Sequence, residues 1–106
     1  MVGAGRLGGL EELVLLALVR LKDNAYGVTI RRELIERTGR DVSIGAIYTT
    51  LERLEGKGYV SSRVGDATPQ RGGRAKRFFR LEARGADALT ASRDVVARMG
   101  EGLSYA

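Results

Sequence analysis

Residues 43–60 read SIGAIYTTLERLEGKGYV, and this stretch is the basis for predicting the fold. Ser43 is a favourable N-cap, because its hydroxyl can accept a hydrogen bond from the first turn of a helix. Apolar residues then recur three or four positions apart, as one face of a helix requires: Ile44, Ile47, Tyr48, Leu51 and Leu54. The stretch therefore predicts an amphipathic helix that begins after Ser43 and ends at Gly56 to Gly58.

The opposite face of this helix carries small or short polar residues and one arginine: Gly45, Ala46, Thr49, Thr50 and Arg53. Long charged side chains are the usual cover of a merely solvated face. Small residues near a helix N-terminus let the backbone approach a grooved surface such as duplex DNA. Small residues also occur where a helix meets a neighbour in its own chain, so both interpretations stay open at this point.

Two further helices are predicted upstream. Over residues 10–22 the apolar positions follow the same spacing: Leu10, Leu13, Val14, Ala17, Leu18 and Leu21. Three more apolar residues widen this stripe until almost no polar face remains: Leu15, Leu16 and Val19. Such a helix must be covered on more than one side, which is a first indication of a dimer. After a break with Asp23 or Asn24 as N-cap, a second helix runs to about Thr38 and is closed by Gly39.

Two short strands flank a basic loop further along the chain. Residues 59–64 and 76–81 mix Tyr, Val and Phe with polar residues, as strands do, and residues 65–75 between them hold the only Pro and several Gly. The pattern predicts a hairpin with a long, mobile tip. Residues 63–80 contain six basic residues and one acidic residue, which accounts for the whole net charge of +5. Such a hairpin is either simply solvated or directed at a polyanion.

The last predicted helix runs from Ala83 to about Leu103. Its seam is spaced three and four apart, with one polar exception: Leu89, Ser92, Val96, Met99 and Leu103. This heptad-like spacing is typical of paired helices, and no further element of the chain is left to cover it. A second copy of the chain is therefore the expected partner. The expected interface residues are Leu15, Leu16, Val19, Leu89, Val96, Met99 and Leu103.

The order helix, helix, helix, strand, basic loop, strand, helix predicts a mainly α fold with a small β-hairpin, the winged helix-turn-helix. We expect a flexible N-terminal segment at residues 1–9, a DNA-binding domain at 10–82 and a C-terminal dimerisation helix at 83–106. In this fold the third helix enters the major groove, and the hairpin, or wing, touches the DNA backbone or the minor groove. The predicted DNA-binding residues are Ser43, Ala46, Tyr48, Thr49, Thr50, Arg53, Arg71, Arg74, Lys76 and Arg77.

Two of these residues have a competing role. Tyr48 lies on the apolar stripe, so it either packs in the core or reaches a phosphate. Arg53 either contacts a phosphate or pairs with Glu52 or Glu55. No Asn, Gln or Lys faces out from the first turns of this helix, so few side chains there can read base edges directly. We therefore expect specificity to rest partly on DNA shape and on contacts of the wing.

The composition argues against an enzyme, a metal site and a membrane protein. The 106 residues include no His and no Cys, which excludes imidazole and thiolate chemistry and leaves a carboxylate pair such as Glu52 and Glu55 as a remote catalytic option. Neither a metal nor a cofactor is expected. The longest apolar run, Leu13 to Val19, is far shorter than the roughly 20 residues that span a bilayer. The Gly-rich start lacks the apolar region of an export signal, so we expect a cytoplasmic protein.

Four segments in order resemble one known family. They are residues 13–18 (LVLLAL), 25–30 (AYGVTI), 44–60 (IGAIYTTLERLEGKGYV) and 73–81 (GRAKRFFRL), the last followed by Gly85. Together they resemble the PadR family of bacterial transcriptional regulators over about Leu10 to Leu103. The most specific match is to the signature G-x-L-Y-x-x-L-x-R-L-E-x-x-G-L-[IV], at Gly45, Tyr48, Leu51, Arg53, Leu54, Glu55, Gly58 and Val60.

The resemblance implies a winged-helix homodimer joined through its first and last helices, usually a repressor that a small molecule releases, often an aromatic compound or a drug. The length is similar to that of the shorter, second subfamily. Three positions depart from the family pattern: Val28 replaces a second aromatic, Phe79 replaces the second Tyr of the wing strand, and Glu82 replaces a capping Thr. Phe79 has no hydroxyl to offer a phosphate, whereas Glu82 still favours a helix start through the helix dipole.

The leading functional prediction is a sequence-specific DNA-binding transcriptional regulator, acting as a homodimeric repressor that a small-molecule effector releases. Its expected partners are duplex operator DNA, a second copy of the chain and that effector. The alternative is a winged-helix protein-interaction module that uses the basic wing for an acidic protein partner. Binding that depends on Arg71 and Arg74 but not on Thr49, Thr50 or Arg53 would favour this alternative.

Overall fold

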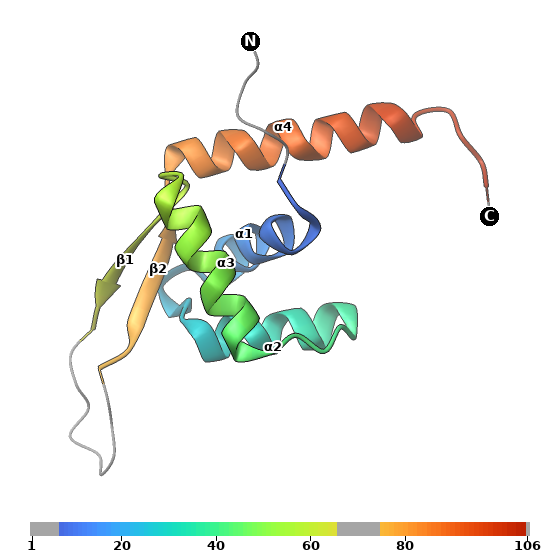
Figure 1. The fold of residues 1–106 in the computed structure, drawn as a ribbon. Coiled ribbons are helices and arrows are strands. Elements are labelled where there is room, and N and C mark those ends of the chain that lie inside the picture. Colours follow the sequence, from blue (N-terminus) through green and yellow to red (C-terminus); the bar gives the residue numbers. More distant parts are fainter. Residues whose placement is uncertain (1–6, 66–74, 106) are drawn as a thin grey trace.

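The computed structural model describes residues 7–65 and 75–105 and confirms the predicted order of elements (Figure 1). These are α1 (Gly9–Leu21), a short 3-10 helix η1 (Lys22–Asn24), α2 (Gly27–Thr38), α3 (Ile44–Gly56), β1 (Val60–Val64), β2 (Arg77–Leu81) and α4 (Ala83–Gly100). The described part contains no helix that is both long and apolar enough to cross a membrane.

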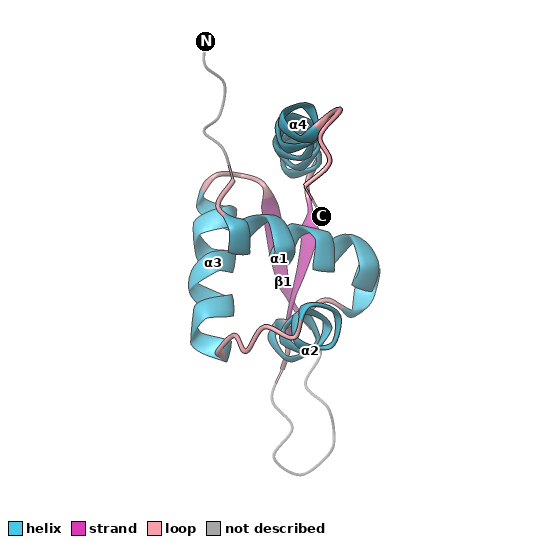
Figure 2. Ribbon diagram, turned by 90° about the vertical axis from the view of Figure 1, so that its right-hand side faces the viewer, coloured by secondary structure: helices cyan, strands magenta, loops and turns pink. Residues whose placement is uncertain are grey.

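Helices α1, α2 and α3 surround one apolar core, and the hairpin closes it on one side (Figure 2). The largest fully buried side chains come from all three helices: Val14, Leu15, Ile30, Ile47, Leu51 and Leu54. Tyr59 and Phe79 add the hairpin to the same core. Each helix thus buries the stripe that its three-and-four spacing defines, because only that stripe faces the other two helices.

The hairpin is antiparallel, with Val60 opposite Leu81 and Val64 opposite Arg77. The segment between η1 and α2 runs along the free edge of β2: the Phe79 N–H donates to the Ala25 carbonyl at 2.9 Å, and Tyr26 forms a β-bridge with Phe78. The hairpin is therefore joined to the start of α2 as well as to the end of α3.

The ends of the helices confirm two predictions and correct one. The Ser43 hydroxyl caps α3 by accepting from the Ala46 N–H at 3.1 Å, and Gly39 closes α2 in a left-handed conformation with φ of 69°, as expected. Asp23 and Asn24 do not cap α2, because they lie in η1. The cap position is Tyr26, whose N–H donates to the Thr29 hydroxyl at 3.0 Å.

Helix α4 is fastened to the rest of the domain at its first turn. The Glu82 N–H donates to the Tyr59 carbonyl at 2.9 Å, and a Cβ on Gly85 would lie only 2.2 Å from that carbonyl oxygen. Glu82 occupies the cap position without a side-chain cap: its carboxylate accepts from the Ser61 hydroxyl and pairs with Arg80 at 3.6 Å. The Glu82 carboxylate therefore interacts with both strands of the wing instead of capping α4.

The N-terminal half of α4 packs on α1, and the rest projects beyond the core (Figure 1). Leu89 belongs to the core, and Ser92 is buried with its hydroxyl 3.4 Å from Glu12 of α1. The expectation that no element of the chain covers the seam is therefore wrong for its first two positions. The reason is that α4 folds back over α1 after the hairpin, a contact between segments far apart in sequence.

Burial also corrects three predictions made from the sequence. Leu15 and Leu89 are both buried in the core of the single chain, so neither side chain is free to meet a second chain. The N-terminal segment 1–9 is shorter than expected, because Leu7 is buried in the core and α1 already begins at Gly9. Residues 1–6 lie outside the described residues.

Candidate nucleic-acid interface

The start of α3 presents a largely uncharged surface. Ser43, Gly45 and Thr49 are exposed, and Ala46 is half-buried. Ile44 belongs to the apolar stripe in sequence but is 41% exposed, because it lies at the first position of the helix, beyond the core. Thr50, in contrast, was expected on the outer face and is only 3% exposed; its hydroxyl donates to the Ala46 carbonyl at 2.8 Å.

Tyr48 is not a core residue, although its sequence position on the apolar stripe allowed that role. It is 38% exposed, and its ring lies against the start of α2, where a Cβ on Gly27 would lie 2.4 Å from its hydroxyl oxygen. The tyrosine therefore connects α3 with the first turn of α2 while part of its surface faces outward. Arg53, further along α3, is exposed.

The turn between α2 and α3 is held by a residue that the sequence did not single out. Arg31 Nε donates to the Val42 carbonyl at 2.7 Å, and its other nitrogens approach Asp41 at 3.5 Å. Val42 is buried, so the turn is anchored on both sides. The spacing of Arg31 in the sequence carries no signal for a hydrogen bond to a carbonyl eleven residues away.

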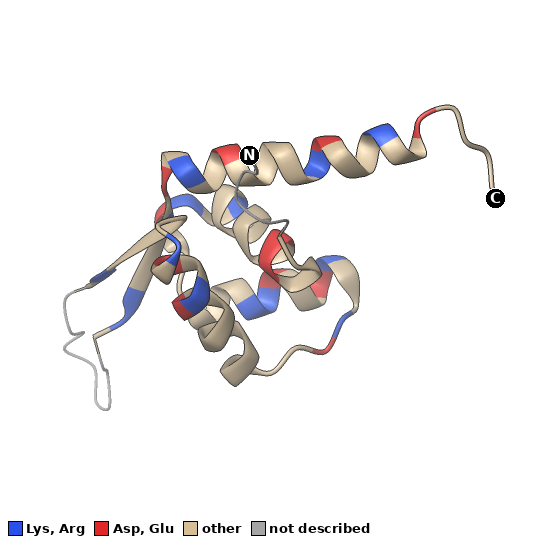
Figure 3. Ribbon diagram, turned by 45° about the horizontal axis from the view of Figure 1, so that its top comes forward, with Lys and Arg blue, Asp and Glu red and all other residues tan. Residues whose placement is uncertain are grey.

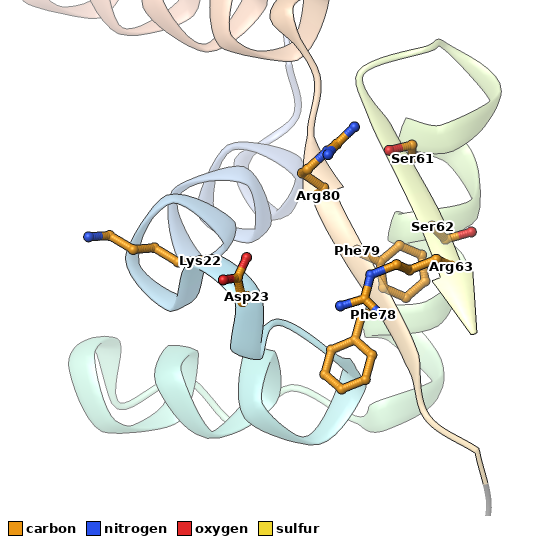
Figure 4. Close-up of a pocket in the computed structure, with 8 residues that line it drawn as sticks. All are labelled: Lys22, Asp23, Ser61, Ser62, Arg63, Phe78, Phe79 and Arg80. Atoms are coloured by element: carbon orange, nitrogen blue, oxygen red, sulfur yellow. The ribbon is translucent and has the colours of Figure 1, made fainter. Parts of the chain in front are cut away.

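The base of the wing combines cations with aromatic rings. The Arg63 guanidinium lies 4.9 Å from the Phe78 ring centre (Figure 4), and Lys76 Nζ lies 4.6 Å from the Tyr26 ring centre. The two rings meet edge to face at 5.5 Å. Both cations remain exposed, so the rings hold them in place through cation–π attraction without neutralising them.

A hollow of about 260 Å³ lies between η1 and the hairpin, beside the Phe78 ring (Figure 4). Its lining residues are Lys22, Asp23, Ser61, Ser62, Arg63, Phe78, Phe79 and Arg80. Three of them are basic and one is acidic. Among the described residues no group of three or more acidic side chains gathers to hold a metal ion.

Glu55 links the end of α3 to both strands of the wing. Its carboxylate accepts from the Ser62 hydroxyl at 2.8 Å and lies 3.8 Å from Arg77. Arg77 Nε in turn donates to the Ser62 oxygen at 3.0 Å. Arg77 is thus exposed but held in place by Glu55 and Ser62. Glu55 is a positioning residue, a role that the sequence did not predict for it.

Basic residues on both strands leave the wing positively charged on each side of its loop (Figure 3). Lys76 and Arg77 are exposed there, as expected for residues that meet phosphates. Arg71 and Arg74, the other two predicted wing contacts, lie outside the described residues.

A buried ion pair joins the start of α1 to the end of α3. Glu11 is buried, and its carboxylate accepts from the Gly8 N–H at 2.8 Å and from Lys57 Nζ at 3.1 Å. Burial by itself raises the pKa of Glu11, but the Gly8 hydrogen bond and the adjacent Lys57 outweigh it. With a further contribution from the Arg53 charge, the pKa of Glu11 lies below its ordinary value.

A second surface, at the other end of the molecule, is apolar and uncovered. Four of the predicted interface residues are exposed: Val19, Val96, Met99 and Leu103. Leu16 is half-buried. These side chains lie on α1 and on the part of α4 that projects beyond the core, together with its C-terminal extension.

Three helices, a two-stranded wing and a capped third helix at one end define a winged helix-turn-helix protein. The chain belongs to a family of that class: the sequence model described as "Transcriptional regulator PadR-like family" matches residues 15–91. Membership in this family supports DNA-binding transcriptional regulation. A comparison with curated proteins finds no significant match.

Solved structures agree with this assignment. A PadR family transcription regulator from hypervirulent Clostridium difficile is 28% identical, with a TM-score of 0.70 over 87% of this chain and 90% of that chain. A PadR-like transcription factor from Bacteroides fragilis is 23% identical, with a TM-score of 0.72 over 87% and 84% of the two chains. A transcriptional regulator from Clostridium thermocellum is 19% identical, with a TM-score of 0.73 over 87% and 86%. The last two show a common fold.

Proposed function

We propose that this chain is a sequence-specific DNA-binding regulator that acts as a homodimeric repressor released by a small molecule. One observation carries the DNA-binding part of the proposal. The start of α3, the start of α2 and the loop end of the hairpin all lie at the end of the domain opposite α4, in both views of the ribbon (Figures 1 and 2). One face can therefore meet a groove and its flanking phosphates together.

The contacts follow from what each element offers at that end. The first turn of α3 brings small residues, the Thr49 hydroxyl and a positive helix dipole to the major groove. Lys76 and Arg63, held on aromatic rings, present charge to the phosphates on one side. The Tyr48 hydroxyl, beside the start of α2, is in a position to donate to another phosphate.

The dimer rests on the uncovered surface of α1 and α4. Val96 and Met99 continue the seam past the point where α1 covers it. Leu103 is exposed beyond the end of α4, and Val19 is exposed on α1. An exposed apolar strip of this kind favours association with a second copy. Repression, and its release by a small molecule, come from the family resemblance.

Duplex binding at two salt concentrations tests the proposal. The protein first selects its preferred duplex from a random pool, and affinity for that duplex is then compared with affinity for an unrelated one. A dimer that neutralises six to ten phosphates loses about 10³- to 10⁵-fold in affinity between about 50 and 200 mM salt. Affinity that does not depend on salt, or that is equal for every duplex, would contradict the proposal and favour a protein partner for the wing.

Two variants separate the roles. Lys76→Ala weakens binding to all duplexes alike and lowers the salt dependence by about one phosphate contact per subunit. Thr49→Ala changes the preference among duplexes at the base pairs that the helix faces.

A further inference from the structure

The DNA-facing end of the domain carries an apolar patch. Val28, at the second position of α2, is 50% exposed, and Ile44, at the first position of α3, is 41% exposed. The two side chains line one shallow hollow between the starts of these helices, together with Arg31, Arg32 and Ser43. The patch is therefore an apolar floor with basic residues at its rim.

Polar groups that could read base edges are scarce around this patch. The Ser43 oxygen is engaged as the α3 cap, and the Thr50 hydroxyl is buried and donates to a carbonyl of its own helix. Gly45 has no side chain. Among the outward residues of the first two turns, only Tyr48 and Thr49 carry a hydroxyl. What this end of α3 presents to a groove is mainly aliphatic.

We infer that Ile44, with Val28 beside it, recognises thymine through its C5-methyl group. This inference rests on the proposed function, since it requires α3 to enter the major groove. The methyl group is the apolar feature by which the major groove distinguishes thymine, and aliphatic side chains contact it directly. Ile44 is the first residue of the helix end that approaches the base edges in this class of protein. Arg32, which is exposed at the rim of the hollow, matches a phosphate that flanks such a contact.

The test removes one methyl group from the DNA and one side chain from the protein. Each thymine of the selected duplex is replaced in turn by uracil, which keeps every hydrogen-bonding group and lacks only the C5-methyl. Affinities of the wild type and of Ile44→Ala are then measured for each duplex. Because Ile44 is substantially exposed, the variant is expected to keep its fold, which circular dichroism checks.

The expected result is a coupling between the two changes. At one or two positions per half-site, uracil weakens wild-type binding about fourfold, as expected for one methyl group worth about 0.8 kcal/mol. The same uracil has no further effect on Ile44→Ala, because the contact is already lost. Val28→Ala reduces the uracil effect in part.

The other outcomes are distinguishable. Sequence-specific, salt-sensitive binding that no uracil weakens overturns the thymine contact and leaves the proposed function standing. A uracil effect of equal size in the wild type and in Ile44→Ala also overturns it, because the methyl group then acts through DNA shape or another residue. Absence of sequence-specific binding overturns both, and the patch would then belong to a protein interface.

Discussion

Gly27 and Tyr48 are in such close contact that a Cβ on Gly27 would lie 2.4 Å from the hydroxyl oxygen of Tyr48 and 2.6 Å from its ring carbon Cζ. Gly27 is the first residue of α2, and Tyr48 projects from α3. The relative placement of the two helices that form the DNA-facing end therefore depends on the absence of one methyl group.

Gly27→Ala is predicted to displace Tyr48. The new methyl group has no room unless the ring moves, and overpacking of this kind costs about 1–3 kcal/mol. We expect a lower free energy of unfolding in urea and weaker binding to duplex DNA.

Gly56→Ala is the matched control, because a Cβ there would meet nothing within 4 Å. Alanine in a helix is favoured over glycine by up to about 1 kcal/mol, so this variant should be as stable as the wild type or more so. Equal stability of Gly27→Ala and Gly56→Ala would show that the close contact does not constrain the fold.

Glu55→Ala is predicted to reduce the ratio of specific to nonspecific DNA affinity. The variant removes the acceptor of the Ser62 hydroxyl and the partner of Arg77, so the wing is no longer held in register with α3. Nonspecific affinity rises with the added positive charge, while specific binding loses about five- to tenfold, the value of one or two hydrogen bonds. Quantitative binding to selected and unrelated duplexes measures the ratio.

Glu52→Ala is the control that distinguishes the effect of the lost negative charge from the effect of the lost contacts with the wing. Glu52 is exposed on the same helix and makes the same change in net charge. If Glu52→Ala reduced the ratio as much as Glu55→Ala does, the contacts of Glu55 with the wing would have no special role.

Glu11 is predicted to make the free energy of unfolding of the domain fall as the pH is lowered through the acidic range. Its pKa is lowered in the folded state, so the unfolded chain binds a proton more readily than the folded one. The stabilisation is complete above the ordinary pKa of a glutamate and disappears as the pH falls through the lower folded-state pKa. Urea unfolding of wild type and Glu11→Gln should therefore differ at pH 7 and converge in acid.

The two partners of this ion pair should not be equally sensitive. Glu11 is buried, whereas the Lys57 side chain is 39% exposed. Glu11→Gln leaves a lysine that can turn to water and costs about 1 kcal/mol, while Lys57→Met leaves a buried carboxylate without its cation and costs about 2–3 kcal/mol. An equal loss in both variants would contradict this asymmetry.

Met99→Asp is predicted to weaken the proposed dimer. Met99 is 76% exposed in the single chain, so the substitution costs the monomer little, but an unpaired carboxylate buried between two copies raises the dissociation constant by about 100-fold or more. Analytical ultracentrifugation over a range of protein concentrations measures the shift. Thr90→Asp adds the same charge to an exposed position on the opposite side of α4 and should leave the dimer intact. Dissociation by both variants would indicate a charge effect rather than an interface.

The sequence by itself determined the elements and their order. Ser43, Gly39 and the three-and-four spacing of apolar residues in α1 and α3 predicted helices whose bounds agree with the structure to within one or two residues. These features are local: a cap satisfies backbone groups within its own first turn, and a helical stripe is defined by neighbours in sequence. The basic wing was predicted for the same reason, since charge can be counted along the chain.

Only the tertiary structure decided which apolar and polar side chains are free. Leu15 and Met99 both fit an interface by spacing, yet Leu15 is fully buried in the core while Met99 is 76% exposed. Thr50 and Thr49 are adjacent in sequence, but one is buried and the other is exposed. Burial, the Glu55 link to the wing and the contact of Tyr48 with Gly27 all join residues that are distant along the chain. Spacing within a helix determines which residues share a face, and the packing of the other elements determines what covers that face.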